Sequence, residues 1–138
     1  MAKTFYGDTS VWRDYLEDRR DGLRPLGEFA FQFLQDCLAH GCRVLYAEPV
    51  LFELQAVSAH WVQHLLTTFK GCLVQVHATR AQAAEAREIA KHRGMAFNDV
   101  FHAVIARDHK AVLVTRDRHF EELLDIVESK TPEDVTFG

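Results

Sequence analysis

The chain has 138 residues, of which 48% are hydrophobic and 26% charged, and its formal net charge is −4. These values are typical of a globular protein, so we expect residues 1–138 to form a single domain. The negative charge argues against nucleic-acid binding through a broad basic face. With no apolar run of roughly 18 residues and no apolar signal region, a cytoplasmic protein without membrane contact is expected.

Short apolar runs alternate along the chain with segments of helical spacing. We expect strands at residues 4–6, 43–46, 73–76, 111–115 and 135–137. Helices are expected at residues 11–20, 25–41, 49–69, 79–94, 98–108 and 120–127. Thr79 and Gln82 form a predicted capping box, and Asn98 is a predicted helix cap. This alternation predicts an α/β domain with a mainly parallel sheet of about five strands.

Two acidic residues stand where predicted strands end, Asp8 in TFYGDTS and Asp117 in AVLVTRD. Ligands of open parallel sheets bind outside the carboxyl ends of the strands, so both carboxylates are expected in one cleft. Glu53 and Asp99 lie near the starts of predicted helices that could point into the same cleft. Carboxylates that converge repel one another, and a hard divalent cation is the usual reason to hold them together.

Each of these acids also has a plainer explanation. An acid at a helix start is often a cap or a dipole partner, and Glu48, beside Pro49, is a rival to Glu53. We favour Glu53 because Glu48 is expected before the helix rather than within it. Zinc is not favoured. Three cysteines without a second ligand pair are expected to be reduced thiols, and His60 and His64 lack the Glu of a zincin motif.

Four stretches together resemble the PIN-domain nucleases, and among them the toxins of VapBC-type toxin–antitoxin pairs. They contain the four acids in the family's order and at similar separations: YGDTSVWRDYL, VLFEL, FNDVFHAVIA and LVTRDRHF. The resemblance covers essentially the whole chain. It implies a three-layer α/β/α sandwich around a central, mainly parallel sheet.

The resemblance also implies roles for individual residues. Asp8, Glu53, Asp99 and Asp117 match the catalytic acids that hold Mg²⁺ or Mn²⁺, and Ser10 and Thr115 match supporting hydroxyl residues. The chain departs from the family pattern at two positions. Asn98 stands where many relatives have Pro, and His119 where many have another Asp, so the resemblance implies four carboxylate ligands and not a fifth.

The basic residues around Asp117 have two interpretations. Arg116, Arg118 and His119 are either ordinary solvated loop charges or contacts to phosphate at the rim of the cleft. Arg13, Arg19 and Arg20 in the first predicted helix are weaker candidates for the same contact. His102, one turn after Asp99, is expected in the wall of the site rather than among its ligands.

The expected function is therefore metal-dependent endoribonuclease activity, as the toxin of a VapBC-type pair. Divalent metals activate water and stabilise charge on the phosphate, and Mg²⁺ prefers oxygen ligands, which fits a set of carboxylates. The resemblance implies an RNA substrate, a small antitoxin partner and a homodimer. The alternatives are a PIN-domain RNA-processing nuclease that is not a toxin, and a non-catalytic RNA-binding module with the same fold.

Overall fold

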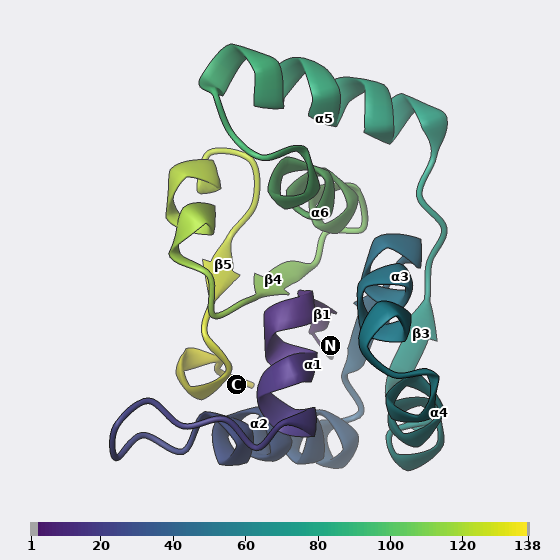
Figure 1. Ribbon diagram of the computed structural model, residues 1–138, viewed down its shortest axis with the longest axis vertical. Coiled ribbons are helices and arrows are strands. Elements are labelled where there is room, and N and C mark those ends of the chain that lie inside the picture. Colours follow the sequence, from purple (N-terminus) through teal and green to yellow (C-terminus); the bar gives the residue numbers. More distant parts are fainter. Residues whose placement is uncertain (1–2, 138) are drawn as a thin grey trace.

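The computed structural model describes residues 3–137, which form a central sheet flanked by helices (Figure 1). The strands are β1 (Thr4–Gly7), β2 (Arg43–Tyr46), β3 (Leu73–Gln75), β4 (Val112–Val114) and β5 (Ser129–Lys130). The α-helices are α1 (Thr9–Leu16), α2 (Leu26–His40), α3 (Glu48–Val57), α4 (Ala59–Thr68), α5 (Arg80–Arg93) and α6 (Phe97–Asp108). Two 3-10 helices follow, η1 (Arg118–Leu123) and η2 (Pro132–Asp134).

All five strands are parallel, in the order β3-β2-β1-β4-β5. The chain steps from β1 through β2 to β3 on one side, and then crosses back to place β4 on the other side of β1. Right-handed crossovers in opposite directions put their helices on opposite faces of a sheet. Accordingly α2 and α6 lie on opposite sides of the strands, and α5 packs outside α6 (Figure 1). The predicted α/β/α sandwich with a parallel sheet is confirmed.

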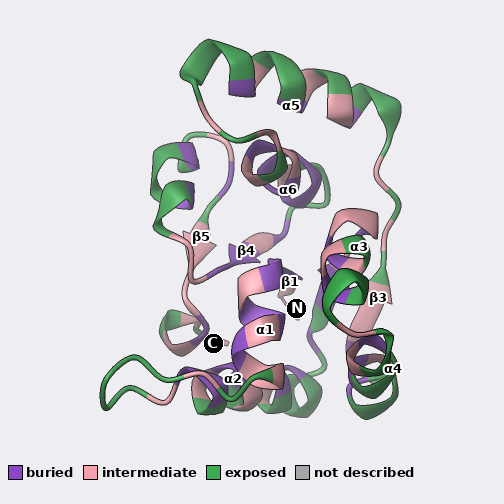
Figure 2. Cartoon of the chain, viewed as in Figure 1, coloured by how far each residue is buried: buried purple, intermediate pink, exposed green. Residues whose placement is uncertain are grey.

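Apolar side chains from both helical layers meet at the strands. β1 and β4 are almost completely buried, whereas α5 is exposed along its outer face (Figure 2). Phe5 of β1 packs edge-on against Phe33 of α2, with ring centroids 5.4 Å apart. Burial on both faces explains why the strands are apolar runs rather than alternating patterns.

Gly7 fixes the way in which the chain leaves β1. The Trp12 indole covers this residue, and its Nε1–H donates to the Gly7 carbonyl oxygen at 3.0 Å. A Cβ atom at position 7 would lie 2.6 Å from Trp12 Cζ2, so only glycine allows this approach. The next residue, Asp8, caps α1 by accepting from the Ser10 backbone N–H. The packing of Trp12 therefore determines where Asp8 emerges from the sheet.

Several predicted boundaries differ from the observed ones. The helix expected at residues 11–20 ends at Leu16, because the polar run that follows has no apolar face to bury. The helix expected at residues 49–69 is divided at Ser58, whose hydroxyl accepts from the Trp61 N–H and caps α4. A serine side chain competes with the backbone for this N–H, which favours a new helix start. Asn98 lies inside α6, whose cap is Ala96.

The C-terminal part differs most from the prediction. The helix expected at residues 120–127 is the 3-10 helix η1, and the last strand is Ser129–Lys130 instead of 135–137. The Thr115 N–H donates to the Lys130 carbonyl oxygen at 2.9 Å, which fixes this edge pairing. Phe137 instead packs its partly buried ring beside Phe5 and Phe33 without forming a strand. Among the described residues, no helix is long and apolar enough to span a membrane.

Candidate active site

The strand order reverses between β1 and β4, and in α/β sheets ligands bind at the carboxyl ends of the strands beside such a reversal. Asp8 directly follows β1, and its backbone N–H donates to the Val114 carbonyl oxygen of β4 at 3.0 Å. Asp117 lies three residues beyond the end of β4. The sheet thus brings together two acids that are more than a hundred residues apart in sequence.

Two hydroxyl groups hold one oxygen of the Asp8 carboxylate. Ser10 Oγ and Thr115 Oγ1 each donate to Asp8 Oδ2 at 2.9 Å. The same hydroxyls accept from the loop after β4, since Arg116 N–H donates to Ser10 Oγ and Asp117 N–H donates to Thr115 Oγ1, both at 3.0 Å. With Oδ2 engaged in this way, Asp8 Oδ1 is the oxygen left for another partner.

Glu53 approaches Asp8 from α3, and a buried histidine lies between them. His102 Nε2 is 3.5 Å from Glu53 Oε1 and 3.9 Å from Asp8 Oδ1. The other ring nitrogen, Nδ1, is 2.8 Å from the hydroxyl of Tyr6, and both side chains are almost fully buried. Burial, together with Asp8 and Glu53, strongly raises the pKa of Tyr6, which keeps its phenol protonated and able to donate.

A Tyr6 hydroxyl that donates to Nδ1 leaves the proton of a neutral His102 on Nε2, facing the two carboxylates. Burial alone would raise the pKa of Glu53, but hydrogen bonds from His102 and Thr9, with the charges of His102 and Arg13, together outweigh it and the pKa is lowered. His102 thus helps to keep Glu53 ionised. It lies in the wall of the site, as expected from the sequence. Tyr6 was missed from the sequence, because an apolar strand run does not distinguish it from a core aromatic.

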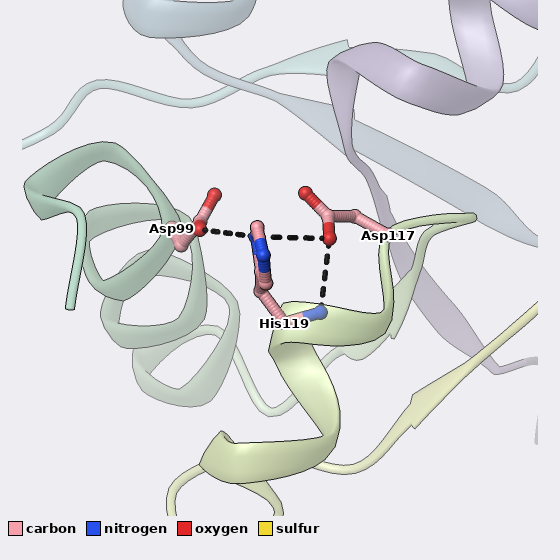
Figure 3. A group of neighbouring side chains, drawn as sticks. All are labelled: Asp99, Asp117 and His119. Carbon is pink, nitrogen blue, oxygen red and sulfur yellow. Dashed lines mark hydrogen bonds and ion pairs between the residues drawn. The ribbon is translucent and has the colours of Figure 1, made fainter.

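Asp99 and Asp117 face each other across the side chain of His119 (Figure 3). One ligand atom from each of the three residues lies within 4.8 Å of the others. Asp117 also caps η1, because its Oδ1 accepts from the His119 N–H at 2.9 Å. Burial raises the pKa of Asp99, and the negative charges of Asp117 and Asp8 add to this effect. The charged form of Asp99 is therefore disfavoured by its own neighbours.

The four predicted acids line a single hollow of about 330 Å³. They come from the end of β1, the middle of α3, the first turn of α6 and the loop after β4. The hollow is also lined by Arg13 and Arg19, two of the three weaker candidates for phosphate contact, whereas Arg20 does not line it. Both pair with Glu17, and neither is buried. The hollow thus combines four carboxylates with two accessible guanidinium groups at its rim.

Arg116 does not face this hollow. Its guanidinium pairs with the buried Asp14 of α1 and with Glu133 of η2, and only 17% of its side chain is exposed. Arg118 is exposed and lines a neighbouring recess that shares Asp117 with the hollow. The side chain of Arg116 therefore ties the loop to α1 and to the C-terminal segment. Its position in sequence, next to Asp117, gives no sign of this.

Glu48, the rival to Glu53, has a different place. It is the first residue of α3 rather than lying before the helix, and it does not line the hollow. Its carboxylate accepts from the Ala78 N–H at 3.0 Å and contacts His77 Nδ1 at 2.9 Å. Glu48 thus anchors the segment that leads from β3 to α5, and Glu53 alone of the two reaches the other acids.

A family model described as PIN domain matches residues 5–124. The chain belongs to the PIN domain family. The matched region runs from the second residue of β1 to just beyond η1 and contains all four acids of the hollow. The resemblance seen in the sequence is therefore confirmed at the level of the family.

Solved structures with the same fold include a toxin–antitoxin complex. The chain is similar to one in VapBC2 from Rickettsia felis bound to a promoter DNA fragment, with a TM-score of 0.68 and 16% identity over 93% of this chain and 98% of that one. It is also similar to a chain in a toxin–antitoxin complex from Klebsiella pneumoniae, with a TM-score of 0.67 and 16% identity over 95% of this chain and 99% of that one. For a chain in FitAcB from Neisseria gonorrhoeae the TM-score is 0.62, with 22% identity over 95% of this chain and 99% of that one. A comparison with curated proteins gives no match.

The donor set fits a divalent cation. Four carboxylates supply oxygen ligands, and hard cations such as Mg²⁺ and Mn²⁺ are bound by oxygen. Burial, with the nearby charges of Asp117 and Asp8, raises the pKa of Asp99. A bound cation would reverse this shift, because an opposite charge favours the ionised carboxylate.

Proposed function

We propose that this PIN-domain protein is a divalent-metal-dependent endoribonuclease and the toxin of a VapBC-type toxin–antitoxin pair. The observation that carries the proposal is the convergence of Asp8, Glu53, Asp99 and Asp117 on one hollow at the reversal point of the sheet. These acids would hold Mg²⁺ or Mn²⁺. When bound, such an ion activates water for attack and stabilises negative charge on the phosphate.

The protein residues have separate tasks in this proposal. Ser10 and Thr115 hold Asp8 Oδ2 so that Oδ1 faces the hollow. His102 holds Glu53, and the loop after β4 holds Asp117 through its hydrogen bond to Thr115. Fixed donors of this kind reduce the reorganisation needed when charge develops in the transition state.

Arg13 and Arg19 are proposed to receive the RNA backbone. Both line the hollow, and both are more exposed than Arg116. A guanidinium can bind phosphate through two parallel hydrogen bonds, which would orient one phosphodiester above the acids. Arg118 and His119 remain candidates for contacts with flanking nucleotides, since both are exposed beside Asp117.

An apolar recess beside the hollow supports an antitoxin partner. Its lining includes Pro49, Phe52 and Phe101, and it shares two residues, Glu53 and Asn98, with the acid site. The Phe52 side chain is 69% exposed. An apolar segment of a small antitoxin could cover these rings and extend to the acids. A homodimer, as the resemblance implies, is part of the same proposal.

The test is cleavage of RNA containing single-stranded loops by the purified chain, with Mg²⁺ or Mn²⁺ and with EDTA. We expect cleavage only with metal, and at least about a hundredfold loss in Asp8→Asn and Glu53→Gln, because metal stabilisation of the transition state is worth several kcal/mol. Glu48→Gln is the matched control, since it removes a nearby acid that does not line the hollow.

Absence of cleavage by the wild type at any metal concentration would contradict the nuclease assignment and favour a non-catalytic module. The toxin role has a separate readout. Induced expression in a bacterial host should arrest growth, and Asp8→Asn should relieve the arrest. An active nuclease whose expression leaves growth unaffected would favour an RNA-processing role instead.

A further inference from the structure

His119 places a nitrogen atom among the acids of the site. Its Nδ1 lies 3.1 Å from Asp117 Oδ1 and 3.4 Å from Asp99 Oδ2 (Figure 3). The three side chains come from two elements, α6 and the loop with η1, and their ligand atoms point toward one another. We propose that His119 is a nitrogen ligand that gives this site a preference for first-row transition ions over Mg²⁺.

The separations between these atoms fit a shared ion. Ligand atoms at about 2.1 Å from a metal are about 3.0 Å apart when they subtend a right angle, and about 3.4 Å apart in a tetrahedron. The two distances from His119 Nδ1, 3.1 and 3.4 Å, fall at these values. Both carboxylate oxygens thus lie at ligand spacing from His119 Nδ1, and within 4.8 Å of each other.

The position of His119 is set by its backbone rather than by its ring. The His119 N–H donates to Asp117 Oδ1 at 2.9 Å, which fixes the first turn of η1 next to the acid. The ring itself is 69% exposed and is not part of the core. The imidazole is therefore held near the carboxylates but remains accessible to an ion, and its replacement should leave the fold intact.

The chemical consequence is a change in metal preference. Mg²⁺ binds oxygen atoms and retains several waters, whereas imidazole nitrogen suits later ions of the first transition row. For such mixed sites the affinity rises from Mn²⁺ through Fe²⁺ and Co²⁺. With aspartate at position 119 the site would have oxygen ligands alone, and its preference for transition ions should fall.

A second role for the histidine makes the opposite prediction. A protonated His119 would act as a cation that neutralises Asp99 and Asp117, and an incoming metal would have to displace it. Its removal would then strengthen the binding of every divalent ion. A ligand, by contrast, strengthens binding, and its removal must weaken binding most for the ions that prefer nitrogen.

The experiment measures the affinities of Co²⁺ and Mg²⁺ by calorimetry for the full chain, without RNA. Variants are His119→Ala and His119→Asp, with the exposed His92→Ala of α5 as the control. We expect the ratio of Co²⁺ to Mg²⁺ affinity to fall at least about tenfold in both variants and to stay unchanged in the control, since weaker second-shell changes already cost that much. The visible spectrum of bound Co²⁺ should shift in His119→Asp, because a nitrogen ligand is replaced by oxygen.

The inference rests on the proposed metal role of the acids, and the two can fail separately. Metal binding by the wild type with an unchanged ratio and spectrum in both variants would overturn the role of His119 and leave the acid site in place. Stronger binding of both ions in His119→Ala would also overturn it. Absence of any divalent binding by the wild type would overturn the metal site together with this inference.

Discussion

Replacement of Asp99 by asparagine should stabilise the protein in the absence of metal. The Asp99 side chain is mostly buried, and its ligand oxygen lies within 4.8 Å of that of Asp117. Two negative charges at this distance repel by about 0.9 kcal/mol in bulk water and by about 3.5 kcal/mol at an effective dielectric constant of about 20. Asp117 is more than a third exposed and His119 offsets part of the repulsion, so we take the lower end, about 1 kcal/mol.

Such a gain should raise the melting temperature by about 4 °C for a chain of this size. The assay is thermal unfolding in EDTA at neutral pH, compared with Glu88→Gln, which removes one exposed acid from α5 and makes the same change in net charge. The direction of the pH dependence of stability follows from the pKa of Asp99. Because the pKa of Asp99 is raised in the folded state, the wild type loses stability as the pH rises through that pKa, and the Asn variant does not.

The difference between the two proteins should therefore grow with pH and vanish in acid, where Asp99 is protonated. Added Mn²⁺ should stabilise the wild type more than the variant, because ligand binding to the folded state raises its stability. A variant that melts at or below the Glu88→Gln control in EDTA would refute the claim that the acids are held together against their own repulsion.

Three further substitutions test the supports of the site. Arg116→Met should lower the free energy of unfolding by about 3 kcal/mol, because it leaves the buried Asp14 with only the more distant Arg19, at 3.8 Å, and thermal unfolding measures this; weaker RNA binding with unchanged stability would instead make it a substrate contact. Tyr6→Phe removes the partner of His102 Nδ1 and should slow cleavage about tenfold with little change in KM, and unaltered kinetics would speak against a positioning role. Thr115→Val should weaken Mn²⁺ binding about tenfold by calorimetry, through loss of its hydrogen bond to Asp8, and equal affinity would exclude that support.

Local patterns were sufficient to predict the fold class and the elements that carry the acids. The capping box of Thr79 and Gln82 and the stop at Gly94 are both as predicted, because each depends on residues within one helix. The last strand was misplaced because Ser129 and Lys130 pair with β4 through backbone atoms and carry no apolar signal. Pairing at the edge of a sheet is decided by tertiary contacts that no short window contains.

The acids of the site were predictable for a different reason than their supports. Asp8 stands at the carboxyl end of a predicted strand, which is where ligands bind in open parallel sheets. The partners of Arg116 lie 102 residues before it and 17 residues after it, and nothing in TRDRHF distinguishes a buried ion pair from a solvated charge. The same holds for Tyr6, whose hydrogen bond to His102 spans 96 residues, whereas His102 itself was expected in the wall of the site.

The most direct test of the central claim is anomalous diffraction from crystals soaked in Mn²⁺. We predict a difference peak in the hollow, within ligand distance of Asp8 Oδ1 and of at least one of Glu53, Asp99 and Asp117, since metal–oxygen distances are about 2.0–2.6 Å. The same crystals of Asp8→Asn should show a weaker peak or none. A fully soaked crystal without a peak in the hollow, or with Mn²⁺ bound away from all four carboxylates, would contradict the account.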